Sequence, residues 1–297
     1  AIPAHKPFIH YTFDNSLSDA NGLVGDGKVT GSLIDSKGGK LKFKDSLVGK
    51  GIYLDGNTGI RLPDNMIQSN KYSVSFWMNP EETTNFTPVF FGARNASSWI
   101  SFVPKSGHDV HNSSYMLWSG EQWYDGLTNS ITPINAWSHV VFNVDNGKIT
   151  VYLNGNVVHK GNNFPDVFSG GKSNVFALGV NYWDVPFKGM IDELRIIPND
   201  IMSAQEIGAH RDEVLSKLTP KALAEQFFKS IRFEKYITQD IVLPTKGERG
   251  AKIVWKSSNK KYVTNSGKVI RPSLEEGDQK VRLTATFMLD GEKFTKS

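Results

Sequence analysis

Apolar and polar residues alternate in short runs from residue 8 to residue 197, and Gly, Asn, Asp and Pro break the runs. This period of two is typical of strands with one buried face, and the frequent breaks favour an antiparallel β-sandwich. The turns Asp145-Asn146-Gly147 and Asn154-Gly155-Asn156 supply residues that tolerate positive φ between two apolar runs. We therefore expect strands at residues 8–13, 40–43, 51–54, 72–78, 89–92, 98–103, 115–118, 137–144, 148–153, 175–178 and 189–196.

The pattern changes after residue 197, where apolar residues at helical spacing follow in two short segments that Ser203 and Thr219 are suited to cap. Alternating strands return from Phe233 onward, at 237–243, 252–257, 262–264, 267–271 and 280–288. The sequence thus predicts an all-β protein with a larger antiparallel sandwich at 1–206, a helical connector at 207–231 and a smaller sandwich at 232–297. Only six residues follow the turn at Asp290-Gly291, too few for a good partner strand, so we expect the smaller domain to be incomplete.

Six sequence blocks of the larger domain match one known family in the same order. They are YTFDNS (11–16), GKGIYLDG (49–56), YSVSFW (72–77), WSHVV (137–141), VYLNG (151–155) and FKGMIDELRI (187–196). In these blocks the chain resembles the laminin-G-like, concanavalin-A-like jelly-roll modules attached to bacterial glycosidases. The resemblance implies a jelly roll but says less about function, because this fold hosts lectins, adhesion modules, enzymes and spacers.

The smaller domain carries a second series of matching blocks: DIVLPT (240–245), IVWKSSN (253–259), GKVIRP (267–272) and VRLTAT (281–286). In these the chain is similar to the immunoglobulin-like modules that follow such glycosidases, above all the arabinan- and xylan-degrading ones. What this resemblance implies is architecture, since these modules usually carry no known chemistry of their own.

The composition and charge of the chain argue against several kinds of site and partner. The chain has no cysteine, which excludes disulfides, thiolate zinc sites and a cysteine nucleophile. No apolar run approaches the roughly 18 to 20 residues of a membrane span, so we expect no membrane insertion. The net charge of +4 is uneven, with 16 Lys and Arg against 19 Asp and Glu up to Glu206, and 18 against 11 beyond it. These later lysines alternate with apolar strand residues and lack an interleaved aromatic platform, which argues against nucleic acid as a partner.

A secreted chain without disulfides fits a Gram-positive bacterium better than a eukaryotic ectodomain. Residues 1–7 have neither the charged nor the apolar region of a signal peptide, as expected after its removal. We expect a monomer that is secreted or attached to the cell surface and that works beside further domains of the same polypeptide.

Asp192 is a carboxylate among apolar strand residues, so it must be paired, capped or metal-bound to offset its desolvation. In related modules the matching aspartate and an acidic residue of the first strand hold a structural calcium ion. The resemblance therefore implies Ca²⁺ held by Asp14 and Asp192, with further oxygens from the turn at 16–22, Asp19 among them. The alternative is that Asp192 pairs with Arg195 or a loop amide and that Asp14 caps a turn.

Aromatic residues in polar, loop-rich stretches are candidates for a sugar site, because rings contact the C–H face of a sugar while carboxylates and amides bind its hydroxyls. We predict carbohydrate binding by Trp99, Trp118, Glu121, Trp123, Tyr124, Asp125, Asn181, Tyr182, Trp183 and Asp184, with Arg94 as an additional donor. The alternative is that some of these rings only close the ends of the sandwich. Trp77, Trp137 and Trp255 lie in alternating strands and are expected in the cores.

Catalysis is disfavoured. Retaining glycosidases need two carboxylates about 5 to 5.5 Å apart, and neighbours such as Asp192 and Glu193 point to opposite faces of a strand. The sequence has no nucleophile elbow, phosphate-binding loop or dinucleotide fingerprint. His108 and His111 are spaced for a shared metal, but their surroundings are typical of an exposed loop.

The sequence therefore predicts a non-catalytic carbohydrate-binding region of a larger secreted glycosidase. The expected ligand is a polysaccharide or oligosaccharide. The glycosidases to which similar modules are attached favour plant-wall arabinan or xylan. Two alternatives stay open: a structural or adhesion spacer at the cell surface, and, less favoured, a glycoside hydrolase or lyase in its own right.

Overall fold

The computed structural model describes residues 6–107 and 116–297, so His108 and His111 lie outside the described residues. The chain forms two compact units, Ala1–Arg211 and Asp212–Ser297. The division falls inside helix α1 (Ala204–Leu215), which begins near the end of the larger sandwich expected from the sequence. In the described part of the chain, no helix is both long and apolar enough to cross a membrane.

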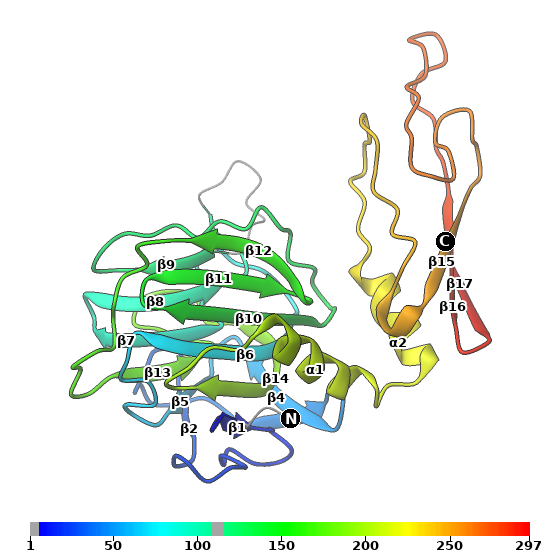
Figure 1. Ribbon diagram of the computed structural model, residues 1–297. Coiled ribbons are helices and arrows are strands. Elements are labelled where there is room, and N and C mark those ends of the chain that lie inside the picture. Colours follow the sequence, from blue (N-terminus) through cyan, green and yellow to red (C-terminus); the bar gives the residue numbers. More distant parts are fainter. Residues whose placement is uncertain (1–5, 108–115) are drawn as a thin grey trace. The chain divides into compact units, whose positions relative to one another are not determined.

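Two antiparallel β-sheets build the first unit (Figure 1). The eight-stranded sheet has the order β12 (Asn156–Gly161), β11 (Lys148–Leu153), β10 (Ser138–Asp145), β6 (Lys71–Pro80), β14 (Lys188–Ile197), β4 (Lys50–Asp55) and β3 (Lys42–Asp45), with β1 (Ile9–Tyr11) also paired to β14. The six-stranded sheet has the order β2 (Lys28–Thr30), β5 (Gly59–Leu62), β13 (Val175–Leu178), β7 (Phe90–Asn95), β8 (Ser98–Val103) and β9 (Met116–Ser119). The expected all-β, jelly-roll-like class is confirmed.

The register of β10, β11 and β12 follows from two tight turns. Asn146 and Gly147 have φ of 49° and 94°, and Asn154 and Gly155 have φ of 49° and 83°. Two successive residues with positive φ form the mirror-image turn whose twist suits a two-residue hairpin, and Asn-Gly is the pair that adopts it at least cost. The turns therefore fix which side chains of these strands face the core, as the sequence predicted.

The main hydrophobic core lies between the two sheets and takes alternate residues from each strand. Aromatic pairs cross it edge to face: the ring centroids of Phe76 and Phe102 are 5.8 Å apart, and those of Phe90 and Phe142 are 5.7 Å apart. Each of these side chains is buried, which contributes roughly 1.5 to 3 kcal/mol per residue toward folding. The core thus makes both sheets rigid supports for the side chains on their outer faces.

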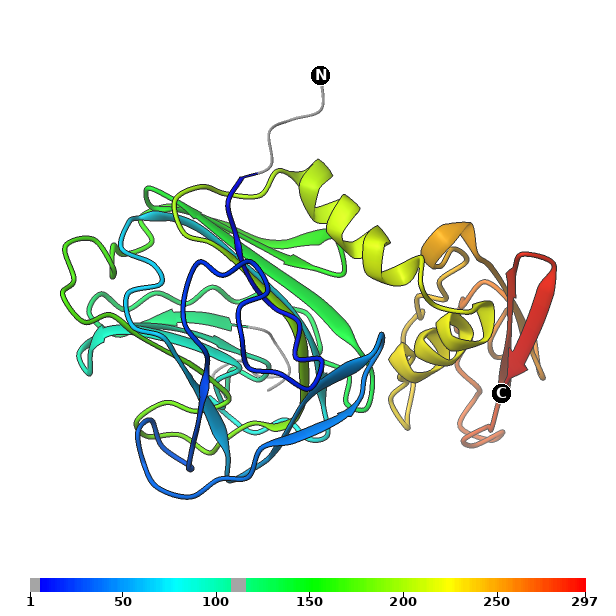
Figure 2. The ribbon, with the colours of Figure 1, turned by 90° about the horizontal axis from the view of Figure 1, so that it is seen from below.

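The outer face of the eight-stranded sheet is covered at one place by the start of α1 (Figure 2). Val141, Ile197, Met202 and Ile207 form a separate buried cluster there. Trp77 is buried on this outer side against His139, with the ring centroids 4.7 Å apart, because its strand neighbours Phe76 and Met78 occupy the inner core. Trp77 is therefore buried, but on the outer face of the sheet. The expectation that it lies in the core between the two sheets is wrong.

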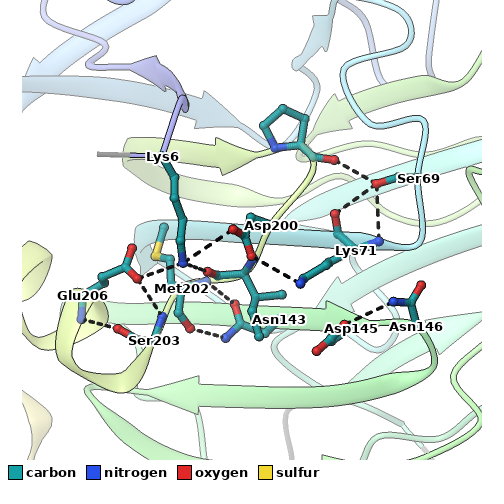
Figure 3. A network of polar contacts seen from close by, with 12 residues as sticks. Lys6, Ser69, Lys71, Asn143, Asp145, Asn146, Asp200, Met202, Ser203 and Glu206 are labelled. Carbon is teal, nitrogen blue, oxygen red and sulfur yellow. Dashed lines mark hydrogen bonds and ion pairs between the residues drawn. The ribbon is translucent and has the colours of Figure 1, made fainter. Parts of the chain in front are cut away.

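A polar network fastens this covering segment to the sheet (Figure 3). Lys6 donates to the carbonyl of Ile201 at 2.6 Å and to Glu206 at 2.9 Å. The Asn143 amide donates to the carbonyl of Met202 at 2.7 Å. Ser203 and Glu206 bond each other's backbone amides in a capping box, which starts α1 where the sequence predicted a cap.

The second unit holds helix α2 (Pro220–Ser230), the short 3₁₀ helix η1 (Glu248–Gly250) and one three-stranded sheet of β15 (Lys252–Ser257), β16 (Leu283–Leu289) and β17 (Glu292–Lys296). Thr219 caps α2 by accepting from the amide of Ala222. Trp255 is buried, as expected, and its indole donates to the carbonyl of Pro244 at 2.8 Å.

Two expectations for the second unit are wrong. The segments 237–243, 262–264 and 267–271 form isolated bridges and single hydrogen bonds rather than a second sheet, among the residues that the structure describes. The six residues after Asp290-Gly291 do suffice for a partner strand, because β17 pairs with β16 over five residues. That the domain is incomplete stays a prediction.

Candidate functional site

A groove of about 360 Å³ opens on the outer face of the six-stranded sheet. Strand β8 explains its position, because Ile100 and Phe102 point into the core while Trp99, Ser101 and Val103 point outward. We call this site the tryptophan groove; the residues that line it are Phe86, Trp99, Ser101, Val103, Trp118, Trp123, Asn181, Trp183 and Asp184.

Two aromatic pairs form its walls. Trp99 and Trp183 have ring centroids 5.6 Å apart and are tilted by 50°. Trp118 and Trp123 lie 4.0 Å apart at 89°, and Phe86 meets Trp118 edge to face at 5.1 Å. Trp183 is 51% exposed and Trp123 is 60% exposed. Large aromatic surface left open to solvent beside a concave site is typical of a binding surface.

One amide side chain holds the loop that carries Trp183. The Asn181 carbonyl oxygen accepts from the backbone amides of Trp183 and Asp184, both at 2.8 Å, and its amide nitrogen donates to the Asp184 carboxylate at 2.8 Å. Asn181 itself is buried. Its three bonds fix both the position of Trp183 and the direction of the carboxylate that lines the groove.

The position of Trp99 depends on a glycine. A Cβ built on Gly120 would lie 2.1 Å from Nε1 of Trp99, so the indole lies directly over the glycine backbone. The amide of Gly120 also donates to the carbonyl of Trp99 at 3.0 Å. Only a residue without a side chain permits this approach.

The structure brings six of the eleven predicted sugar-binding residues to the tryptophan groove, namely Trp99, Trp118, Trp123, Asn181, Trp183 and Asp184. The other five are absent from its lining. Arg94 donates to the carbonyl of Ser169, and Glu121 accepts from Ser98. Tyr124 packs against Phe164, Asp125 is exposed, and Tyr182 packs behind the wall against Phe91.

Sequence reasoning missed Phe86, Ser101 and Val103. The period of two from Trp99 along β8 would have placed Ser101 and Val103 on the same face. Phe86 lies in the loop before β7 with φ of 62°, and no local pattern marks it.

The residues predicted to bind calcium, Asp14, Asp19 and Asp192, do not line the tryptophan groove. Asp192 is buried, and its carboxylate accepts from the Ser46 hydroxyl and from the Glu193 amide. Burial raises the pKa of Asp192 to about 8, with smaller contributions from the negative charges of Glu193 and Asp14. A cation beside this carboxylate would favour its charged form and lower its pKa again.

Asp14 and Asp19 also bind backbone groups. Asp14 accepts from the Lys50 amide at 2.7 Å, which caps the adjoining turn. Asp19 is buried, and its carboxylate accepts from the amides of His10, Asn21, Leu23 and Val24, which leaves it the better fit to a turn cap than to a metal. The described residues contain no group of three or more His, Cys, Asp or Glu placed for a metal, so calcium stays a prediction.

Comparison with known proteins identifies the superfamily of the chain. The model of the concanavalin A-like lectin/glucanases superfamily matches residues 54–208. The chain belongs to this superfamily. The model of the atrophied bacterial Ig domain matches residues 220–297, which accords with the reduced sheet of the second unit. Both family resemblances noted in the sequence are confirmed. No curated protein sequence matches the chain.

Among solved structures, this superfamily member is similar to domain 4 of AbnA, an extracellular GH43 arabinanase from Geobacillus stearothermophilus, solved in complex with arabinotriose. The two are 48% identical with a TM-score of 0.64, over 68% of this chain and 96% of that one. The binding domain of botulinum neurotoxin serotype D/C is 13% identical with a TM-score of 0.51, over 97% of this chain and 72% of that one. The second similarity concerns the fold alone.

Proposed function

We propose that this chain is a non-catalytic carbohydrate-binding region of a secreted glycosidase and that the tryptophan groove binds arabinose oligosaccharides. The observation that carries the proposal is a groove walled by exposed tryptophans in a chain 48% identical to an arabinanase domain solved with arabinotriose. The sequence favoured plant-wall arabinan or xylan, and the arabinotriose bound by that relative supports arabinan of the two.

The chemistry of the groove suits a sugar. Trp123 and Trp183 offer exposed ring faces for the C–H face of a sugar ring, and the Asp184 carboxylate accepts from its hydroxyls. Hydrolysis by the paired-carboxylate mechanism needs two carboxyl groups, and Asp184 is the one carboxylate among the described lining residues. Binding without catalysis is therefore the favoured activity.

A binding region of this kind acts through tethering. When it holds an arabinan chain, an attached catalytic domain meets the same polymer at a high effective concentration. Weak binding by one groove then suffices to keep the enzyme on its substrate.

Isothermal titration with arabinotriose tests the proposal. Trp183→Ala or Trp123→Ala should each weaken binding by about 1 to 3 kcal/mol, the cost of removing a stacking aromatic from a binding hot spot. Tyr236→Ala, which removes an aromatic ring that is 67% exposed in the second unit, is the matched control and should bind as the parent does.

Circular dichroism should show the parent fold in all three variants. Equal affinity in the parent and both tryptophan variants would place the site elsewhere. No binding of arabinotriose, xylotriose or other neutral oligosaccharides by the parent chain would favour the spacer alternative.

A further inference from the structure

The floor of the tryptophan groove holds a hydroxyl that the protein leaves without a partner. Ser101 lies on β8 between Trp99 and Val103, on the face that lines the groove, and is 2% exposed. Its hydroxyl makes no hydrogen bond within the described residues. A buried hydroxyl without a partner destabilises a fold. Because the Ser101 oxygen is covered in the free protein, a rotation about the Cα–Cβ bond would bring it to a ligand that supplies the missing bond.

The charge of the groove is the second observation. Among the lining residues that the structure describes, Asp184 is the only one with a charged side chain, and neither Lys, Arg nor His is present. The bond from Asn181 holds the Asp184 carboxylate in place. A ligand carboxylate would enter a partly desolvated site beside a like charge and without a cation to pair with, which is unfavourable.

We infer that the tryptophan groove selects uncharged sugars, with Ser101 bonding a sugar hydroxyl at its floor and Asp184 excluding sugars that carry a carboxylate. This inference rests on the proposed function, because it assigns roles within the same groove. It adds a class of ligand that the groove rejects and names the two side chains that set the choice.

Titration of the whole chain with arabinotriose and with trigalacturonic acid tests the inference. The parent should bind the acidic trisaccharide at least about tenfold more weakly. Arabinotriose affinity should be the same at about 20 and 150 mM NaCl, because an uncharged ligand has no interaction to screen. Asp184→Asn keeps an oxygen that accepts from Asn181, and it should reduce the discrimination at least about threefold.

Ser101→Ala separates a ligand contact from a structural role. It should weaken arabinotriose binding about three- to tenfold, as expected for one lost hydrogen bond. The melting temperature should stay equal or rise, because the change removes a hydroxyl that the protein does not bond. Ser119→Ala is the matched control, since the Ser119 hydroxyl on β9 is also buried and without a partner in the described residues but lies outside the groove lining. It should leave affinity unchanged.

The outcomes distinguish this inference from the proposed function. Parent affinity for arabinotriose in Ser101→Ala, or equal binding of both trisaccharides by the parent, would overturn the inference and leave the proposed function intact. A lower melting temperature in Ser101→Ala would reveal a structural role for the hydroxyl and would also overturn it. Failure of the parent to bind arabinotriose or any neutral sugar would remove the proposed function, and the inference with it.

Discussion

Replacing Gly120 by alanine should displace Trp99 from the wall of the tryptophan groove without substituting any residue of its lining. The new Cβ would lie 2.1 Å from Nε1 of Trp99 and 2.5 Å from its Cε2. Ordinary contacts are 3.4 Å or longer, so the ring must shift by more than about 1 Å or the two strands must separate.

The neighbours of Trp99 determine how it moves. Phe91 and Trp183 both pack against Trp99, with ring centroids 5.9 Å and 5.6 Å from the indole and 6.2 Å from each other, so they block movement of the indole in their direction. Overpacking of this kind costs about 1 to 3 kcal/mol in the free energy of unfolding. If the ring instead swings out of the wall, arabinotriose affinity should fall by about 5- to 150-fold, the equivalent of one stacking aromatic.

The assay pairs titration of arabinotriose with urea unfolding followed by tryptophan fluorescence. Gly25→Ala is the control, because no atom lies within 4 Å of the Cβ that it would add. Gly25→Ala should change neither affinity nor stability by much. Should Gly120→Ala bind arabinotriose within twofold of the parent, Trp99 is not part of the binding surface and the assignment of the wall is refuted.

Two further predictions concern stability. Removing calcium with a chelator should lower the melting temperature by several degrees, because a ligand bound only to the folded state stabilises that state. Asp192→Ala should reproduce the shift. An unchanged melting curve after verified metal removal would count against the metal. Burial, with the charges of Arg211, His210 and Arg195, holds the pKa of His139 well below 6.5, so the unfolded chain takes up a proton first as pH falls. Stability should therefore decline below about pH 6.5 by up to about 1.4 kcal/mol per pH unit, and His139→Gln should flatten that decline in urea unfolding at pH 7 and pH 5; an equal slope in both proteins would contradict it.

The sequence predicted elements where one local signal dominates. The hairpin turns at Asn146 and Asn154 were correct because positive φ is a local requirement. Strands β2 and β5 were missed because a strand of three or four residues shows too little of a period to be recognised, unless most of its residues are apolar as in β9 and β13.

The site was harder to predict than the fold, because it depends on contacts between distant segments. Trp123 and Tyr124 are neighbours in the sequence, yet the first lines the groove and the second packs against Phe164 on the main core. Trp183 reaches Trp99 only because the loop after β13 returns over the outer face of β7 and β8. Composition identified both segments as aromatic and polar, but only the tertiary fold decides which rings share a surface.

The loop that carries Trp183 also joins the two sheets, since it leaves β13 in the six-stranded sheet and leads to β14 in the eight-stranded one. Strand β14 is hydrogen-bonded on both sides, to β6 and to β4. If the tryptophan groove holds a polymer as proposed, part of any tension on that polymer enters the protein through Trp183 and this loop. That part of the load reaches a strand that is paired along both of its edges, so hydrogen bonds to two neighbouring strands hold it in place.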